Sequence, residues 1–168
     1  MQNIIAEVIQ LLNTVLRMAE RTFYRSPSEH DIAAFRRLTQ SLPEPQLHGF
    51  LNRAGAAGVI DTGFAARIED WQTEATLATN TFDNGRLEKA KTRLWRALDT
   101  LLACTHRHGF SAVGHHGGVA TVRPDIKGIE GPTPVEYPTV RAEVQNLAHK
   151  AQRQYSAFLK DCTRRLRL

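Results

Sequence analysis

The sequence predicts an all-α protein, a four- or five-helix bundle with a long glycine- and proline-rich insertion before the C-terminal helix. Apolar residues recur three and four positions apart over most of the chain, which is the period of a helix that buries one face. Proline and glycine residues stand between the periodic segments. The 168 residues fit one helical domain, 1–168, with the insertion at about 108–138.

Each helix is predicted from a start or stop signal beside a periodic segment. Ser28 is a favourable N-cap, and Pro138 suits the first turn of the last helix because its missing amide hydrogen needs no partner there. In chain order the main predicted helices cover Gln2 to Tyr24, the segment between Ser28 and Pro43, a segment that begins near Asp61 or Thr62 and is broken by Asn80 to Gly85, Arg86 to about Arg107, and Pro138 to the C-terminus. A short helical piece from Gln46 to Arg53 lies between the second and third of them. Within the insertion, Val119 to Val122 suits a short strand.

The last two predicted helices have the most regular apolar faces. On the first of them the face consists of Leu87, Ala90, Leu94, Ala97, Leu98, Leu101 and Leu102. On the C-terminal helix it consists of Val140, Val144, Leu147, Ala151, Tyr155, Phe158, Cys162 and Leu166. We expect these faces to form much of the core, and we expect Cys104 and Cys162 to be small buried hydrophobic residues.

The charge is unevenly distributed along the chain. The total is +5, but residues 1–84 carry 7 Arg and no Lys against 10 acidic residues, while residues 85–168 carry 15 basic against 7 acidic residues. The first half therefore has a net charge of −3 and the second half +8. A basic second half favours an anionic partner, either a nucleic acid or the acidic surface of a protein.

A basic stripe on the helix over Arg86 to Arg107 is the best-defined candidate surface. Arg86, Lys89, Arg93 and Arg96 are spaced three or four positions apart, so they share an arc of about 80° on the helix. Arg164 and Arg165 near the C-terminus are candidates to extend it. Such a row binds phosphates in some proteins, and in many others it is a solvated helix face.

Histidines form the second cluster. His106 and His108 lie at the end of the same helix, and His115 and His116 lie in the insertion. They are weak candidates for metal ligands, because His106 and His108 point about 160° apart on a helix and the spacing matches no standard zinc site. We expect no metal and no other cofactor.

Enzyme motifs are scarce in this sequence. It contains no phosphate-binding glycine loop, no dinucleotide-binding glycine pattern and no Gly-x-Ser-x-Gly elbow. Arg25 and His30 have a spacing found in some small helical RNase toxins, but Pro27 interrupts the helix between them. The catalytic residues of any such enzyme stay unknown, and we lean against an enzyme.

The sequence thus favours a bacterial-type cytoplasmic protein that is regulatory or an adaptor and acts by binding another protein or itself, as in a homodimer. The alternatives are a nucleic-acid-binding protein that uses the basic helix face, or a small Arg/His-dependent RNase-like toxin. The sequence has no apolar run of about 18 to 20 residues, so we expect no membrane partner.

Overall fold

A computed structural model of the chain describes residues 28–108, 119–121 and 136–168. Within these residues the fold is all-α, as predicted, and more than half of the 168 residues lie in five α-helices. In chain order the elements are α2 (Glu29–Ser41), α3 (Glu44–Ala57), β1 (Val59–Asp61), α4 (Thr62–Ala75), the 3₁₀ turn η1 (Ala78–Asn80), α5 (Gly85–Arg107), β2 (Val119–Thr121) and α6 (Tyr137–Leu166). The predicted helix over Gln2 to Tyr24 and most of the insertion fall outside the described residues.

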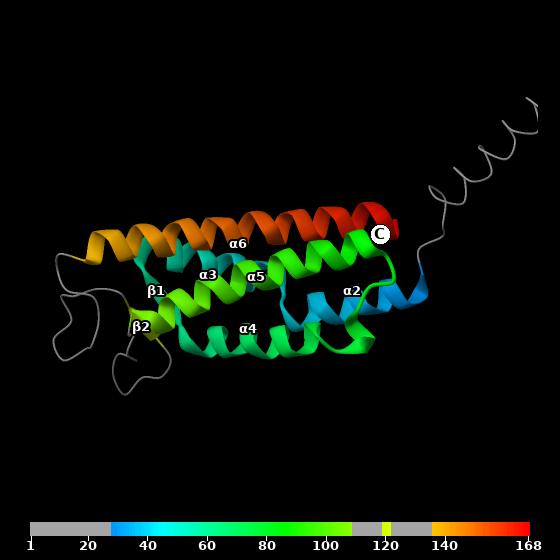
Figure 1. The fold of residues 1–168 in the computed structure, drawn as a ribbon, viewed down its shortest axis with the longest axis horizontal. Helices are drawn as coiled ribbons and strands as arrows, with labels where there is room; N and C mark the ends of the chain where they lie inside the picture. Colours follow the sequence, from blue (N-terminus) through cyan, green and yellow to red (C-terminus); the bar gives the residue numbers. More distant parts are fainter. Residues whose placement is uncertain (1–27, 109–118, 122–135) are drawn as a thin grey trace, which may run out of the picture.

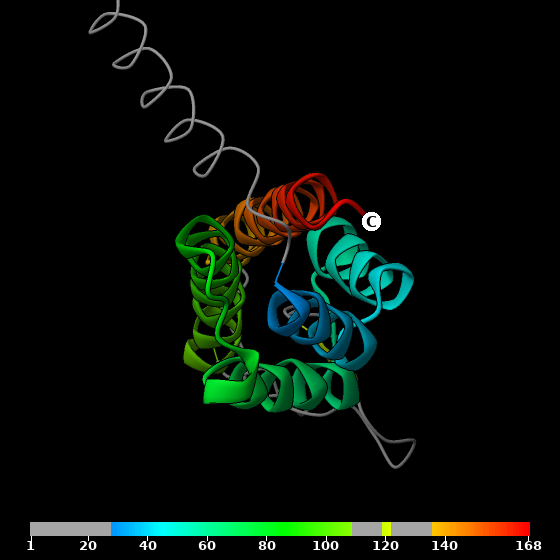
Figure 2. The same cartoon turned by 90° about the vertical axis from the view of Figure 1, so that its right-hand side faces the viewer.

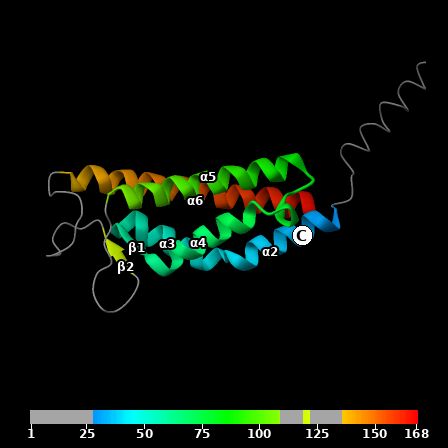
Figure 3. The same cartoon turned by 60° about the horizontal axis from the view of Figure 1, so that its bottom comes forward.

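The helices lie roughly along the long axis of the bundle, and α5 and α6 are side by side and antiparallel (Figure 1). Viewed end-on, α5 lies between α6 and α4, while α2 and α3 close the other side of the bundle (Figure 2). A third view also shows α5 along α6 (Figure 3). The end of α5 therefore lies beside the start of α6, at the same end of the molecule as the two short strands.

Side-chain caps fix the starts of three helices. The Ser28 hydroxyl accepts a hydrogen bond from the Asp31 amide at 3.0 Å, which confirms the predicted N-cap. Asp61 caps α4 in the same way, with its carboxylate 2.9 Å from the Phe64 amide nitrogen. Asn84 caps α5 through the Arg86 amide at 3.0 Å, so the basic stripe begins at a well-defined helix end.

The core is built mainly on the two regular apolar faces. All seven apolar residues predicted on α5 are buried. On α6 the prediction is wrong at Leu147, which is half-buried, while Ala148 is fully buried in its place. The reason is the neighbouring α3, whose Gly55 lies so close that a Cβ built on it would be 3.6 Å from the Ala148 Cβ. Only a small α6 side chain fits that contact, so the helix turns Ala148 inward.

Helix α3 is longer than the predicted Gln46 to Arg53. It begins at Glu44, with Pro45 in the first turn, where the missing amide hydrogen costs no helical hydrogen bond. It also continues through Gly55, which is buried, and ends at Ala57. The residue after it, Gly58, caps the helix with a left-handed φ of 62°, which suits glycine. Packing against α6 overrides the turn that the Ala-Gly-rich sequence predicts.

The predicted strand in the insertion is present as β2, and its partner is β1 between α3 and α4. The two pair antiparallel, with Val59 opposite Thr121 and Asp61 opposite Val119. None of the described helices is both long enough and apolar enough to cross a membrane.

Candidate functional site

The α5 basic face consists of Arg86, Lys89, Arg93 and Arg96. All four side chains are exposed. Within the described part of the chain, none of them makes an ion pair or a hydrogen bond, whereas other arginines do: Arg37 donates to Asn80 at 2.8 Å and Arg53 lies 3.7 Å from Asp61. Among the described residues, nothing neutralises these four charges.

The acidic residue of the first turn of α5 does not neutralise this face. Glu88 turns inward, where its Oε2 lies 3.0 Å from the Lys91 Nζ and accepts the Phe82 amide hydrogen at 2.9 Å. Lys91 is buried, and its Nζ also donates to the carbonyl oxygens of Ala75 (2.8 Å) and Asn80 (2.9 Å). The pattern of apolar residues gives no sign of this buried lysine, because it occupies a position that an apolar residue would normally fill.

The flanks of α5 show where the basic face points. Trp95 and His106 lie on the side of α5 that contacts α4, through Gln72 and Glu69 respectively. Cys104 lies near Glu143 of α6. Arg86 is eighteen positions before Cys104, which is five helical turns, so the two side chains leave α5 in the same direction. The basic face therefore lies on the α6 side of α5, away from α4.

Charge is distributed by helix as well as by sequence half. Six basic and two acidic residues lie in each of α5 and α6, a formal charge of +4 for each helix. Helix α4 has one basic and three acidic residues, a formal charge of −2. Figure 2 places α5 between α6 and α4. The two helices of charge +4 are therefore neighbours, and α4 lies on the far side of α5 from α6, which gives the bundle a basic side and an acidic side.

The two C-terminal arginines differ from the α5 basic face. The end of α6 lies near the start of α5, so Arg164 and Arg165 are at the Arg86 end of the molecule (Figure 1). Arg164 donates to Asp161 at 2.9 Å, and Arg165 is half-buried, with an Nε that has no hydrogen-bond partner in the described residues. They are less available to a partner than the four side chains on α5.

The two histidines at the end of α5 contact acidic residues on two different helices. The His106 Nε2 lies 3.8 Å from Glu69 of α4, and the His108 Nε2 lies 3.6 Å from Glu143 of α6. His115 and His116 fall outside the described residues, as does Arg25 of the RNase-like spacing. The other residue of that spacing, His30, is hydrogen-bonded through its Nε2 to the Thr81 carbonyl oxygen at 2.8 Å, which is a structural contact.

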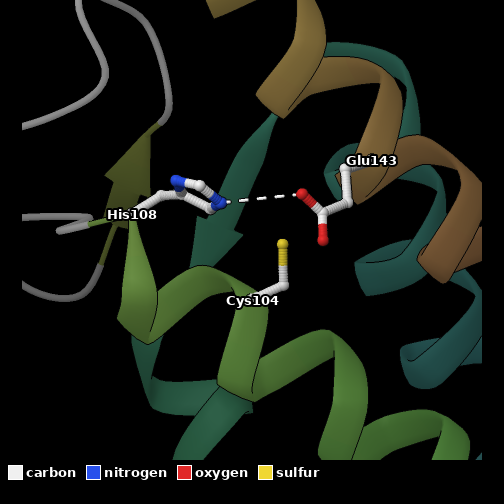
Figure 4. Close-up of side chains that lie close together, drawn as sticks. All are labelled: Cys104, His108 and Glu143. Carbon is white, nitrogen blue, oxygen red and sulfur yellow. Dashed lines mark ion pairs between the residues drawn. The ribbon is translucent and has the colours of Figure 1, made fainter. Parts of the chain in front are cut away.

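Cys104, His108 and Glu143 form a compact cluster that the sequence reasoning missed (Figure 4). Cys104 and His108 are four positions apart, so they project from the same side of α5 one turn apart. Glu143 points at them from α6, and one ligand atom from each of the three residues lies within 4.8 Å of the others. The four-residue spacing was visible in the sequence, but the glutamate became part of the cluster only through the α5–α6 packing.

The Cys104 thiol is not set up as a nucleophile. Burial, followed by the charge of Glu143 and its hydrogen bond, raises the pKa of Cys104 to about 11, and Arg107 lowers it only in part. A neutral, buried thiol is a poor nucleophile, because the thiolate is the reactive form. The cluster therefore does not resemble the activated Cys–His pair of a hydrolase.

Comparison with known protein families, curated protein sequences and solved structures finds no match for this chain.

Proposed function

We propose that this protein acts by binding, without catalysing a reaction of its own, and that its α5 basic face docks onto the acidic surface of a protein partner. The observation that carries the proposal is the set of four exposed cations with no partner in the described residues, on a helix whose apolar face is buried in the core. A rigid helix presents these charges at fixed spacing, so less entropy is lost on binding than for a flexible tail.

The composition of the face favours carboxylates. Three of its four residues are arginines, whose planar guanidinium groups form paired hydrogen bonds with carboxylate oxygens. Base stacking is not supported, because the aromatic residue of α5, Trp95, donates its indole N–H to the Gln72 carbonyl oxygen at 3.1 Å and packs half-buried toward α4. Single-stranded nucleic acid normally needs exposed aromatic rings beside the basic residues.

A second copy of the chain is one such acidic partner. Glu69, Asp70 and Glu74 are exposed along α4, on the acidic side of the bundle. The acidic residues on α4 of one copy are complementary to the α5 basic face of another copy. This complementarity supports self-association as one form of the function. A protein that acts in this way is a regulator or an adaptor, and its two free cysteines, Cys104 and Cys162, fit the reducing cytoplasm.

A second candidate is binding of duplex nucleic acid. It is favoured by the formal charge of +4 on both α5 and α6, which extends the basic region beyond one helix. Phosphate binding would release counterions, so the affinity would fall with salt by a slope of about 0.9 per phosphate contact.

The test is fluorescence anisotropy with two labelled probes of equal charge, an acidic Glu/Asp peptide and a short DNA duplex. We expect the unmutated protein to bind the peptide more tightly, and R86Q/K89Q/R93Q/R96Q to lose that binding. The matched control is K150Q/R153Q/K160Q, which removes three exposed cations from α6 and should retain it.

The proposal fails if the unmutated protein does not bind the peptide, or if both variants lose binding equally. Tighter binding of the duplex, with a salt slope about 3 to 4 units smaller in the α5 variant, would transfer the function to the second candidate.

A further inference from the structure

The Cys104–His108–Glu143 cluster lies where the end of α5 meets the start of α6. Cys104 is buried, and the His108 Nε2 is enclosed without a hydrogen-bond partner in the described residues, 3.6 Å from a Glu143 carboxylate oxygen. Figure 4 shows the sulfur, the imidazole and the carboxylate pointing toward a common space. An enclosed nitrogen that lacks a hydrogen bond usually has a further partner.

From this geometry we propose that the cluster binds a divalent transition metal of the zinc class, through the Cys104 Sγ, the His108 Nε2 and one Glu143 carboxylate oxygen. Thiolate and imidazole are ligands that select zinc and related ions over magnesium and calcium. Three protein ligands leave a fourth position for water or another ligand, as in zinc sites that are not fully closed by the protein.

The distances suit a zinc ion after a small adjustment. Tetrahedral zinc with bonds of about 2.0 to 2.3 Å brings neighbouring ligand atoms to roughly 3.3 to 3.6 Å of each other. The His108–Glu143 pair is already at 3.6 Å, and no pair in the cluster exceeds 4.8 Å. Side-chain rotations that move the ligand atoms by about 1 Å close the remaining gap.

The charges also suit a divalent ion. Binding replaces the proton of the Cys104 thiol, which passes to solvent, and the resulting thiolate and the Glu143 carboxylate neutralise the two positive charges of the metal. No net charge is then enclosed between the helices, which avoids the cost of burying an unpaired charge. The side chains of His108 and Glu143 are 24% and 44% exposed, so the ion reaches the site from solvent.

A metal at this position would link the end of α5 to the start of α6. Two ligands come from Cys104 and the C-cap residue His108, one turn apart, and the third comes from Glu143 of α6, so the ion cross-links the two helices. Binding should therefore raise the melting temperature as well as fill the site.

The experiment is a titration of the full chain, stripped of metal by a chelator, with Co²⁺ and then Zn²⁺. We expect a 1:1 complex with a thiolate-to-cobalt charge-transfer band in the near ultraviolet, which Zn²⁺ removes, and a rise in melting temperature with either ion. Cys104→Ser should abolish the band, and His108→Ala and Glu143→Gln should each weaken Zn²⁺ binding by more than about tenfold, the lower bound for outer-shell partners of metal sites.

The matched controls are Cys162→Ser, which alters the other buried thiol, and His106→Ala, which removes the neighbouring histidine. Both should bind Co²⁺ with the same band and affinity. His108→Ala keeps the test valid if Cys104→Ser does not fold. The proposal is overturned if the unmutated chain shows no charge-transfer band, or if Zn²⁺ binding survives unchanged in both His108→Ala and Glu143→Gln.

Discussion

The charged side chain of Lys91 is buried between α5 and η1. Its Nζ holds the carbonyl oxygens of Ala75 and Asn80 together with the Glu88 carboxylate. These contacts hold the Glu88 carboxylate at the inner side of α5, where it also accepts the Phe82 amide hydrogen.

We predict that Lys91→Met lowers the free energy of unfolding by roughly 3 kcal/mol, the lower end of the range for breaking a buried ion pair. Methionine keeps the apolar stem but removes the donor of two buried carbonyl oxygens and the cation beside Glu88, which still accepts the Phe82 amide hydrogen. Urea unfolding followed by circular dichroism measures the loss.

The matched control is Lys89→Met, two positions away and exposed, which should change the free energy of unfolding by less than about 0.5 kcal/mol. Equal losses in the two variants would show that the Lys91 contacts do not stabilise the fold.

The contact between α3 and α6 sets which α6 residues face the core. Gly55 of α3 meets Ala148 of α6, and this close approach turns Leu147 to the edge of the buried face. The period of apolar residues favours leucine over alanine as the buried residue, so it cannot show that a neighbouring helix leaves room for only a methyl group. Within the described residues, periodicity predicted the positions of the helices but not the ends of α3 and α4. Caps and apolar faces are local in the sequence, which is why the positions were predictable.

One of the candidate sites could be predicted from the sequence, and the others could not. The α5 basic face was predictable, because its residues lie on one helix and need only the helical period. The Cys104 cluster and the Lys91 contacts were not, since each depends on residues from different elements brought together by packing.

For the α3–α6 contact, we predict that Gly55→Ala is tolerated or stabilises by up to about 1 kcal/mol, whereas Gly55→Leu destabilises by roughly 1 to 3 kcal/mol. An added Cβ meets Ala148 at an ordinary 3.6 Å and improves helix propensity, but a larger side chain has no space. Chemical denaturation of both variants tests this, and equal stability of the two would contradict the packing.

The whole bundle has a pH dependence that its buried thiol helps to set. Burial, with smaller contributions from Asp161 and Asp31, raises the pKa of Cys162 from 9.0 to about 12. The thiol is therefore neutral in the folded protein at a pH where the unfolded chain already ionises it. The stability that the folded protein gains from this protonated thiol is complete below pH 9 and is lost as the pH rises toward 12.

We accordingly predict that stability falls on the alkaline side, with Cys162 contributing at most about 1.4 kcal/mol per pH unit between its two pKa values. Melting temperatures measured from pH 8 upward should fall less steeply in Cys162→Ala. Parallel profiles for the two proteins would show that the thiol is not buried as described.

Across the described part of the molecule, the basic side of the bundle is the feature on which the proposed function depends. Its exposed lysines allow a direct test, because carbodiimide joins a lysine to a carboxylate only where the two are in contact. Lys89 lies on the α5 basic face, while Lys150 and Lys160 are exposed on α6 and serve as internal controls.

The decisive measurement is mass spectrometry of carbodiimide cross-links formed with the acidic peptide, and between ¹⁴N- and ¹⁵N-labelled copies of the chain. The account predicts that cross-links concentrate at Lys89 and disappear in R86Q/R93Q/R96Q, which keeps that lysine but removes its neighbours. Cross-links spread evenly over Lys89, Lys150 and Lys160, or confined to the two α6 lysines, would contradict a docking surface on α5.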